Sequence, residues 1–309
     1  MHLKRSDGSM NAAPYFMLGG AQLAVGAAAI FARWALTGAL PLAVSAGRLC
    51  IASIVLLLVA RIRGETEATT RRERVILVAA GVFLALHFAG WVWSLEYTSV
   101  AVSTLLVTTT PIWTALYDSA FRSKHLSPLA WSAFGVGAIG LALIVGFNRT
   151  APPVAGHSPI GAVLALVGAF AIGAYWILIR EVRDSLSTRT IVTNTYSWAA
   201  IALVLAAFVA RQPAPNVHNG IAWGGILAMA ILSQLLGHTA LNAALRWFSP
   251  SAIAFTTVIE PVIAALLALA IFHEALTPAG LVGGVLVLAA IAVVLREETR
   301  TAASGVAAA

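Results

Sequence analysis

The stretch SVAVSTLLVTTTPIWTAL at residues 99–116 returns, 150 positions later, as SPSAIAFTTVIEPVIAAL at residues 249–266. Chance explains shared alanines and leucines in an apolar chain, but it rarely aligns prolines such as Pro111 and Pro261. The alignment needs no gap, and it also pairs Ser99 with Ser249, Ala115-Leu116 with Ala265-Leu266, and Leu126-Ser127-Pro128 with Leu276-Thr277-Pro278. An internal repeat in an apolar chain is a signature of membrane transporters, because one half can rock against the other.

The composition is that of a membrane protein. Hydrophobic residues make up 60 % and charged residues 10 % of the 309 positions, and the mean hydropathy is +0.90. Apolar stretches of about 20 residues, each long enough to cross a bilayer as a helix, recur along the chain. We predict an all-α integral membrane protein with ten transmembrane helices. The predicted spans are residues 14–36, 40–61, 74–96, 99–120, 128–147, 159–180, 190–210, 220–245, 250–272 and 278–296.

Four spans begin with a hydroxyl residue that can cap a helix, followed by a proline suited to the first helical turn. These pairs are Ser127-Pro128, Ser158-Pro159, Ser249-Pro250 and Thr277-Pro278. We expect them to mark helix starts closely, whereas the other ends can move by about two to four residues.

The offset of the repeat predicts how its two copies are oriented. It carries the fourth span onto the ninth, and a shift of five spans reverses the direction in which a copy crosses the membrane. We therefore predict two inverted five-helix halves around a central cavity. The halves are residues 1–147 and 159–309, joined by the polar linker 148–158.

Basic residues are distributed unevenly between the two sides of the predicted bundle. Only Arg33, Arg149 and Arg211 lie on one side. The other side holds Lys4, Arg5, Arg61, Arg63, Arg71, Arg72, Arg74, Arg122, Lys124, Arg180, Arg183, Arg189, Arg246, Arg296 and Arg300. The positive-inside rule then predicts that both termini are cytoplasmic. The net charge of +7 therefore reflects topology, and we expect no nucleic acid as a partner.

Polar residues in the spans indicate which helices line the cavity. Gln234, His238 and Asn242 are spaced four apart in the eighth span, which puts three polar groups on one helix face. A face of this kind avoids lipid, so we expect it to contact the substrate. His87 and Trp91 form a similar pair in the third span.

Arg48 is the only basic residue deep inside the predicted hydrocarbon region. Its guanidinium group could clamp a substrate carboxylate, or it could form an ion pair with Glu260 or Glu96. Both roles remain open from the sequence.

Glu260 lies within the ninth span, directly before Pro261. A carboxylate at this depth costs about 2 to 4 kcal/mol unless it is paired or protonated, so it is a functional candidate. We consider Glu260, His87 and His238 for proton coupling. The alternatives are a structural ion pair or backbone hydrogen bonding for the glutamate, and simple packing for the histidines. We expect the prolines at 111 and 261 to act as hinges.

Aromatic side chains in the interior of the spans predict an amphiphilic substrate. Trp91, Tyr175, Trp176 and Tyr196 are the residues that we expect in the cavity wall, together with Trp113 and Trp198. For any single one of them, core packing is the alternative.

The fifth and tenth spans carry almost no polar residues but several glycines: Gly135, Gly137, Gly140, Gly280, Gly283 and Gly284. Glycines let helices approach closely in a membrane. We expect these spans to be peripheral and to pack against neighbouring helices or against a second subunit in a homodimer.

Enzyme chemistry is not indicated. The sequence has no HExxH motif, no GxSxG motif and no pair of aspartates within the spans. The single cysteine, Cys50, excludes a disulfide framework, and the histidines lack metal-ligand spacing. We predict no cofactor and no metal site.

The repeat motifs resemble the EamA repeat of the drug/metabolite transporter superfamily. The resemblance rests on Tyr97-Thr98-Ser99 through Thr110-Pro111, on Phe248-Ser249-Pro250 through Glu260-Pro261, and on His273-Glu274-Ala275-Leu276-Thr277-Pro278. The glutamate of the last motif is common in such repeats, and the first copy has Lys124 at that place. The resemblance implies a ten-helix basket in a bacterial inner membrane, with Arg48 matching an arginine often found in the second helix.

The function expected from these features is secondary transport of a small metabolite, exported or exchanged by alternating access. Amino acids are the favoured substrates, and exporters of the YddG type are chemically the most compatible members. A multidrug, nucleobase or vitamin efflux carrier is the alternative, and an intramembrane enzyme is the least favoured reading. Membrane lipid and the small-molecule substrate are the expected partners.

Overall fold

A computed structural model describes residues 13–64, 67–121, 127–147, 159–244, 247, 256–257, 259–275 and 277–307. These residues form helices and connecting turns, with no strand among them. The helices are α1 (Ala13–Gly26), α2 (Ala28–Ala35), α3 (Pro41–Arg63), α4 (Arg71–Ser94), α5 (Val100–Val107), α6 (Thr110–Phe121), α7 (Pro128–Phe147), α8 (Pro159–Arg180), α9 (Thr188–Val209), α10 (Gly220–Ala228), the π-helix η1 (Met229–His238), α11 (Thr239–Ala244), α13 (Glu260–Phe272) and α14 (Pro278–Ala307).

Seven stretches of the described chain are long and apolar enough to cross a membrane, and three shorter apolar helices accompany them. The seven stretches match predicted spans one to four and six to eight; the shorter helices lie in spans five, nine and ten. Helices begin at the predicted Pro128, Pro159 and Pro278. The predicted helix start at Ser249-Pro250 and the linker 148–158 lie outside the described residues.

Three of the long stretches, the first, the fourth and the eighth predicted spans, are not single regular helices; the first is divided into α1 and α2. The fourth is interrupted between α5 and α6, because Pro111 has no N–H to donate to the carbonyl of Val107. The Thr110 hydroxyl donates to that carbonyl instead, at 2.9 Å. The eighth stretch contains the π-helix η1, where the Thr239 hydroxyl donates to the carbonyl of Gln234, five residues earlier, at 3.2 Å. Irregular backbone inside a membrane protein is tolerated where it is buried in protein or lines a cavity.

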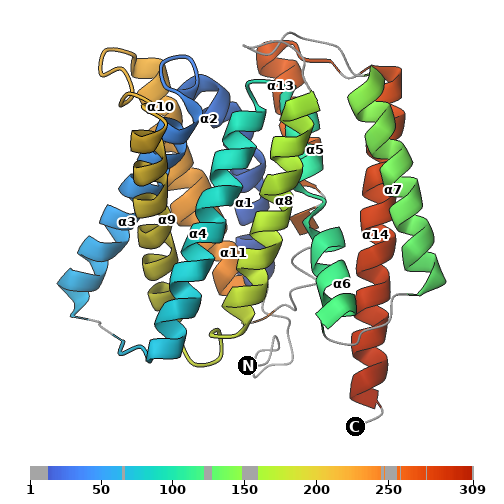
Figure 1. Cartoon of the computed structure of the whole chain (residues 1–309), viewed down its shortest axis with the longest axis horizontal. Helices are drawn as coiled ribbons and strands as arrows, with labels where there is room; N and C mark the ends of the chain where they lie inside the picture. Colours follow the sequence, from blue (N-terminus) through green and yellow to red (C-terminus); the bar gives the residue numbers. More distant parts are fainter. Residues whose placement is uncertain are drawn as a thin grey trace.

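The helices pack as a central group and an edge pair (Figure 1). In the central group, α4 packs against α8 and α9, α3 packs against α9, and α1 packs against η1. The edge pair consists of α7 and α14, which lie side by side in the figure and contact each other extensively. The largest buried core is built by the central group. We call α1 to α7 the N-terminal half and α8 to α14 the C-terminal half.

The two ends of the bundle differ in charge. At one end, which we call the basic end, lie the arginines of the last turn of α3, the first turn of α4 and the last turn of α8. These are Arg61, Arg63, Arg71, Arg72, Arg74 and Arg180. The opposite end, here the far end, holds the end of α2, the start of α3 and the end of α13, at the top of Figure 1.

Glycines let α7 and α14 approach until their backbones touch. A Cβ atom on Gly140 would lie 2.6 Å from the carbonyl oxygen of Gly283, and a Cβ on Gly283 would lie 2.6 Å from that of Gly140. Close approach of this kind gains van der Waals contact, the main source of helix association in lipid. The glycine faces predicted for close packing therefore meet within one chain, and the predicted homodimer stays a prediction.

We expect Gly140→Ala to lower the melting temperature of the purified protein by several degrees, because the added methyl group meets a backbone carbonyl and overpacking costs about 1–3 kcal/mol. Gly135 is the matched control, since a Cβ there would have no atom within 4 Å. Gly135→Ala should leave the melting temperature unchanged or slightly raised. Equal effects of the two substitutions would contradict the described α7–α14 contact.

Candidate functional site

Arg48 is buried in the centre of the helix packing, with 0 % of its surface exposed. Its Nε donates a hydrogen bond to Oε1 of Gln234 at 2.9 Å. Its Cζ lies 3.9 Å from the centre of the Phe88 ring and 5.8 Å from that of Trp91. An aromatic face stabilises a desolvated cation by about 2 kcal/mol. Among the described residues no carboxylate pairs with Arg48.

The neighbouring backbone holds Arg48 in place. The Ser45 hydroxyl lies within hydrogen-bond distance of the carbonyls of Pro41, at 2.9 Å, and of Phe88 in α4, at 3.1 Å. This contact fixes α3 against α4 one helical turn before Arg48. Phe88, whose ring lies next to the guanidinium, is itself fully buried.

Both predicted histidines contact the same aromatic ring. The His87 ring lies 4.7 Å from the Phe88 ring, and His238 meets Phe88 edge to face at 5.5 Å and 90°. His87 also lies parallel to Trp91, at 6.5 Å and 7°. Its Nδ1 donates to the carbonyl of Gly168 at 2.9 Å, which leaves Nε2 as an acceptor on the neutral ring. We call Arg48, His87, Phe88, Trp91, Gln234 and His238 the Arg48 cluster.

The Arg48 cluster has an excess of hydrogen-bond donors. Four of its buried nitrogen atoms have no hydrogen-bond partner: Nη1 and Nη2 of Arg48, Nε1 of Trp91 and Nε2 of Gln234. All four carry N–H groups that donate and do not accept. Each unpaired buried donor costs about 1–3 kcal/mol, and a group with several acceptor oxygens removes that cost. Chemically, the cluster can hold a carboxylate or another oxyanion.

A second polar group continues from the Arg48 cluster along η1 and α11. The Tyr175 hydroxyl donates to Oδ1 of Asn242 at 3.3 Å, and the Tyr175 ring lies edge to face with Trp176 at 5.2 Å. Asn242 donates from Nδ2 to the carbonyl of His238 at 2.8 Å. The rings of Tyr175 and Trp176 thus form an apolar surface next to the polar group of Asn242.

Tyr196 lies next to the Arg48 cluster. Its hydroxyl lies 3.4 Å from Oγ1 of Thr239, and Thr239 donates to the carbonyl of Gln234 at 3.2 Å. The expectation that Trp198 shares this wall is wrong. Trp198 is 40 % exposed and shares an exposed face of α9 with Ile201 and Leu205, so it faces outward from the bundle.

Glu260 stands apart from these residues. It opens α13, is 8 % exposed, and makes no hydrogen bond or ion pair with a described residue. The residues around it face α1: Gln22 donates to Oγ1 of Thr256 at 2.7 Å, and Ile263 lies 3.0 Å from a Cβ placed on Gly26. The described contacts therefore place Glu260 at the seam between α1 and α13 and do not join it to Arg48.

The two predicted hinge prolines lie where helices begin. Pro111 follows the α5–α6 break, and Pro261 occupies the first turn of α13. Their motion stays a prediction. Phe88 could not be identified from the sequence, because an apolar residue in a span has no special pattern, and neither could Gly168, whose contribution is a backbone carbonyl. No group of three metal-binding side chains exists within the described part of the chain.

Apolar helices of membrane-spanning length, packed around a buried polar cluster, are the structure of a multi-pass membrane protein. The sequence model of the EamA-like transporter family matches residues 13–146 and again residues 159–296. The chain therefore belongs to the EamA-like transporter family, within the drug/metabolite transporter superfamily. It is a membrane transporter of small molecules.

Among solved structures, one described only as the crystal structure of a protein is similar to this chain, with a TM-score of 0.63 and 17 % identity. The match covers 92 % of this chain and 97 % of the other. At that identity the likeness shows the fold alone. A search of curated proteins gave no match.

A carboxylate at position 234 would neutralise Arg48 from within the chain. We expect Gln234→Glu to raise the melting temperature and to weaken binding of an oxyanion by about tenfold or more, since the new ion pair occupies the donors. Thermal unfolding and substrate uptake measure the two effects.

The matched control is Gln212→Glu. The Oε1 atom of Gln212 accepts the backbone N–H of Leu42 at 2.9 Å and that of Ala43 at 3.4 Å, which a carboxylate does equally well. Both properties should stay near those of the unmodified protein. A lowered melting temperature in Gln234→Glu alone would contradict the contact between Gln234 and Arg48.

Proposed function

We propose that this protein is a secondary carrier for small metabolites bearing a carboxylate, with amino acids first, and that it exports or exchanges them by alternating access. The observation that carries the proposal is the set of four unpaired N–H donors in the Arg48 cluster. The adjoining rings of Tyr175 and Trp176 suit an amphiphilic side chain, as in the substrates of YddG-type exporters.

Charge argues against the alternative substrates. A multidrug efflux carrier for organic cations would need acidic or neutral aromatic groups at the site, whereas the fully buried charge of this cluster is a guanidinium. Nucleobases and vitamins without a carboxylate or phosphate would leave the donors of Arg48 only partly paired. These carriers remain the second candidate, in which Arg48 has a structural role.

We also propose how the protein is arranged in the membrane and which membrane it occupies. The five-span offset of the repeat supports two inverted halves, residues 1–147 and 159–309, that rock around the cavity. The positive-inside rule supports a cytoplasmic basic end and cytoplasmic termini, and therefore a far end that faces outward. A bacterial inner membrane is the setting that EamA-like proteins suggest.

The test is counterflow into proteoliposomes preloaded with each of the twenty amino acids, with a trace of labelled amino acid outside. Saturable uptake above empty liposomes is expected for a subset of them. For the best substrate, its carboxamide analogue keeps the shape and loses the negative charge, so it should compete about tenfold or more weakly. Arg48→Met should abolish counterflow without lowering the melting temperature, because a buried charge is replaced by an apolar chain of similar length.

Equal competition by acid and amide would contradict the carboxylate site. No counterflow with any amino acid, together with counterflow of a labelled organic cation, would favour the multidrug carrier instead.

We further propose that transport is coupled to protons through Glu260. The Glu260 carboxylate is buried and has no partner among the described residues. We expect Glu260→Gln to abolish accumulation driven by a proton gradient and to leave exchange of substrate intact, since only the first process needs a titrating group. His87→Gln and His238→Gln test the other two groups in the same way. Unchanged pH dependence in all three variants would rule out coupling through them.

A further inference from the structure

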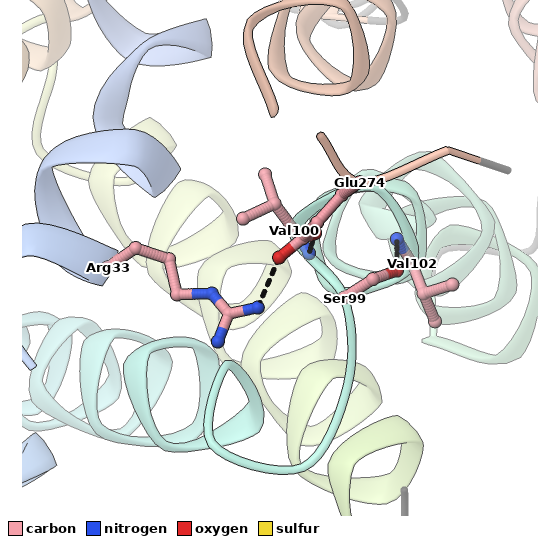
Figure 2. A network of polar contacts seen from close by, with 5 residues as sticks. All are labelled: Arg33, Ser99, Val100, Val102 and Glu274. Carbon is pink, nitrogen blue, oxygen red and sulfur yellow. Dashed lines mark hydrogen bonds and ion pairs between the residues drawn. The ribbon is translucent and has the colours of Figure 1, made fainter. Parts of the chain in front are cut away.

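Glu274 joins the two halves of the protein at the far end. It lies in the segment between α13 and α14, with only 6 % of its side chain exposed. Its Oε1 pairs with the Arg33 guanidinium of α2, and its Oε2 accepts the backbone N–H of Val100, at the start of α5, at 2.9 Å. Figure 2 shows the side chains of Arg33 and Glu274 pointing toward each other beside the first turn of α5.

The start of α5 needs this carboxylate. The first N–H groups of a helix have no partner within the helix, and a negative charge near them is favourable. The Ser99 hydroxyl accepts the N–H of Val102 at 3.3 Å, and Glu274 accepts that of Val100. The Glu274 carboxylate of the C-terminal half therefore accepts hydrogen bonds from two donors of the N-terminal half, the Arg33 guanidinium and the Val100 N–H.

A different ion pair joins the halves at the basic end. Asp118 of α6 accepts a hydrogen bond from Arg180 of α8 at 3.1 Å. At the same end, the Glu67 carboxylate accepts the backbone N–H of Ser187 at 2.9 Å. Hydrogen bonds from the Thr190 hydroxyl and from Ser187 lower the pKa of Glu67, so it stays ionised at neutral pH. Each end thus has its own bridge between the halves.

Two halves that alternate in access must separate at one end while they stay closed at the other. We propose that the Arg33–Glu274 pair, with the Val100 N–H, is the gate of the far end: it closes that end in this structure and breaks when that end opens. The proposal rests on alternating access. It makes Arg33 and Glu274 positioning residues for transport that contact no substrate in the Arg48 cluster.

The test measures opening directly, without substrate, by thiol labelling in nanodiscs, where both faces are accessible. A Cys50→Ser background removes the single native cysteine. Thr104→Cys reports on the far end, since Thr104 is 5 % exposed and lies one turn from Val100 on the same face of α5. Thr114→Cys, in α6, reports on the basic end.

Glu274→Gln keeps an acceptor oxygen for the Val100 N–H and removes the charge that pairs with Arg33. We expect it to raise the labelling rate at position 104 by about tenfold and to leave position 114 unchanged, because the equilibrium shifts toward the open far end. Arg33→Met should act in the same direction, and Arg33→Lys should act less. Asp118→Asn is the matched control at the other end and should raise labelling at position 114 only.

A single gel-filtration peak establishes that each variant is folded. Equal labelling after denaturation establishes that each sample contains the same amount of reactive cysteine. If neither Glu274→Gln nor Arg33→Met raises labelling at position 104, the pair is not a gate. If Asp118→Asn raises labelling at position 104 as strongly, the effect is general loosening and the proposal is also wrong. Both outcomes are independent of which substrate is carried, so they are distinct from a failure of the proposed function.

Discussion

The centre of the helix packing holds a buried guanidinium charge, that of Arg48, which has no carboxylate partner among the residues that the structure describes. Placing a charge at this depth is costly unless its surroundings replace water. Here the Phe88 ring and one oxygen of Gln234 replace part of the water, and two nitrogens of Arg48 stay unpaired. A protein selected only for stability would supply a partner for them. In the function that we propose, the unfilled donors are a stability cost retained for binding.

The irregular backbone helps to build this site. The π-helix η1 carries Gln234 and His238, the two residues that reach the Arg48 cluster from the C-terminal half. The break at Thr108–Thr109 divides the fourth span into two short helices, and the hydroxyls around it satisfy carbonyls that a regular helix would pair. Close glycine contacts to backbone atoms occur both in the α7–α14 pair at the edge of the bundle and between α10 and α2, where a Cβ on Gly225 would lie 2.4 Å from the carbonyl oxygen of Phe31. The irregular helices next to the Arg48 cluster are compatible with motion around it.

The sequence predicted the class of fold and most of the cluster, for physical reasons. Membrane spans must be apolar over about 20 residues, so the local composition of the sequence predicts them. Proline after a capping hydroxyl correctly predicted three helix starts among the described residues. Polar residues in such spans avoid lipid, which identified Arg48, His87, Gln234 and His238. Phe88 was missed because its role depends on what stacks on it. Trp198 was misplaced because an aromatic residue suits a core and a lipid face equally. The separation of Glu260 from Arg48 depends on tertiary packing that helical rise alone does not determine.

The most direct test of the central claim is a solid-state NMR distance between the carboxyl carbon of a bound ¹³C-labelled amino acid and the guanidinium nitrogens of ¹⁵N-labelled Arg48, assigned by comparison with Arg48→Lys. The amino acid is the one with the strongest counterflow. The account predicts a dipolar coupling that corresponds to about 4 Å, the separation in a charge-assisted hydrogen bond between the two groups. A bound substrate without measurable coupling to Arg48 would contradict the account and would give the buried arginine a purely structural role.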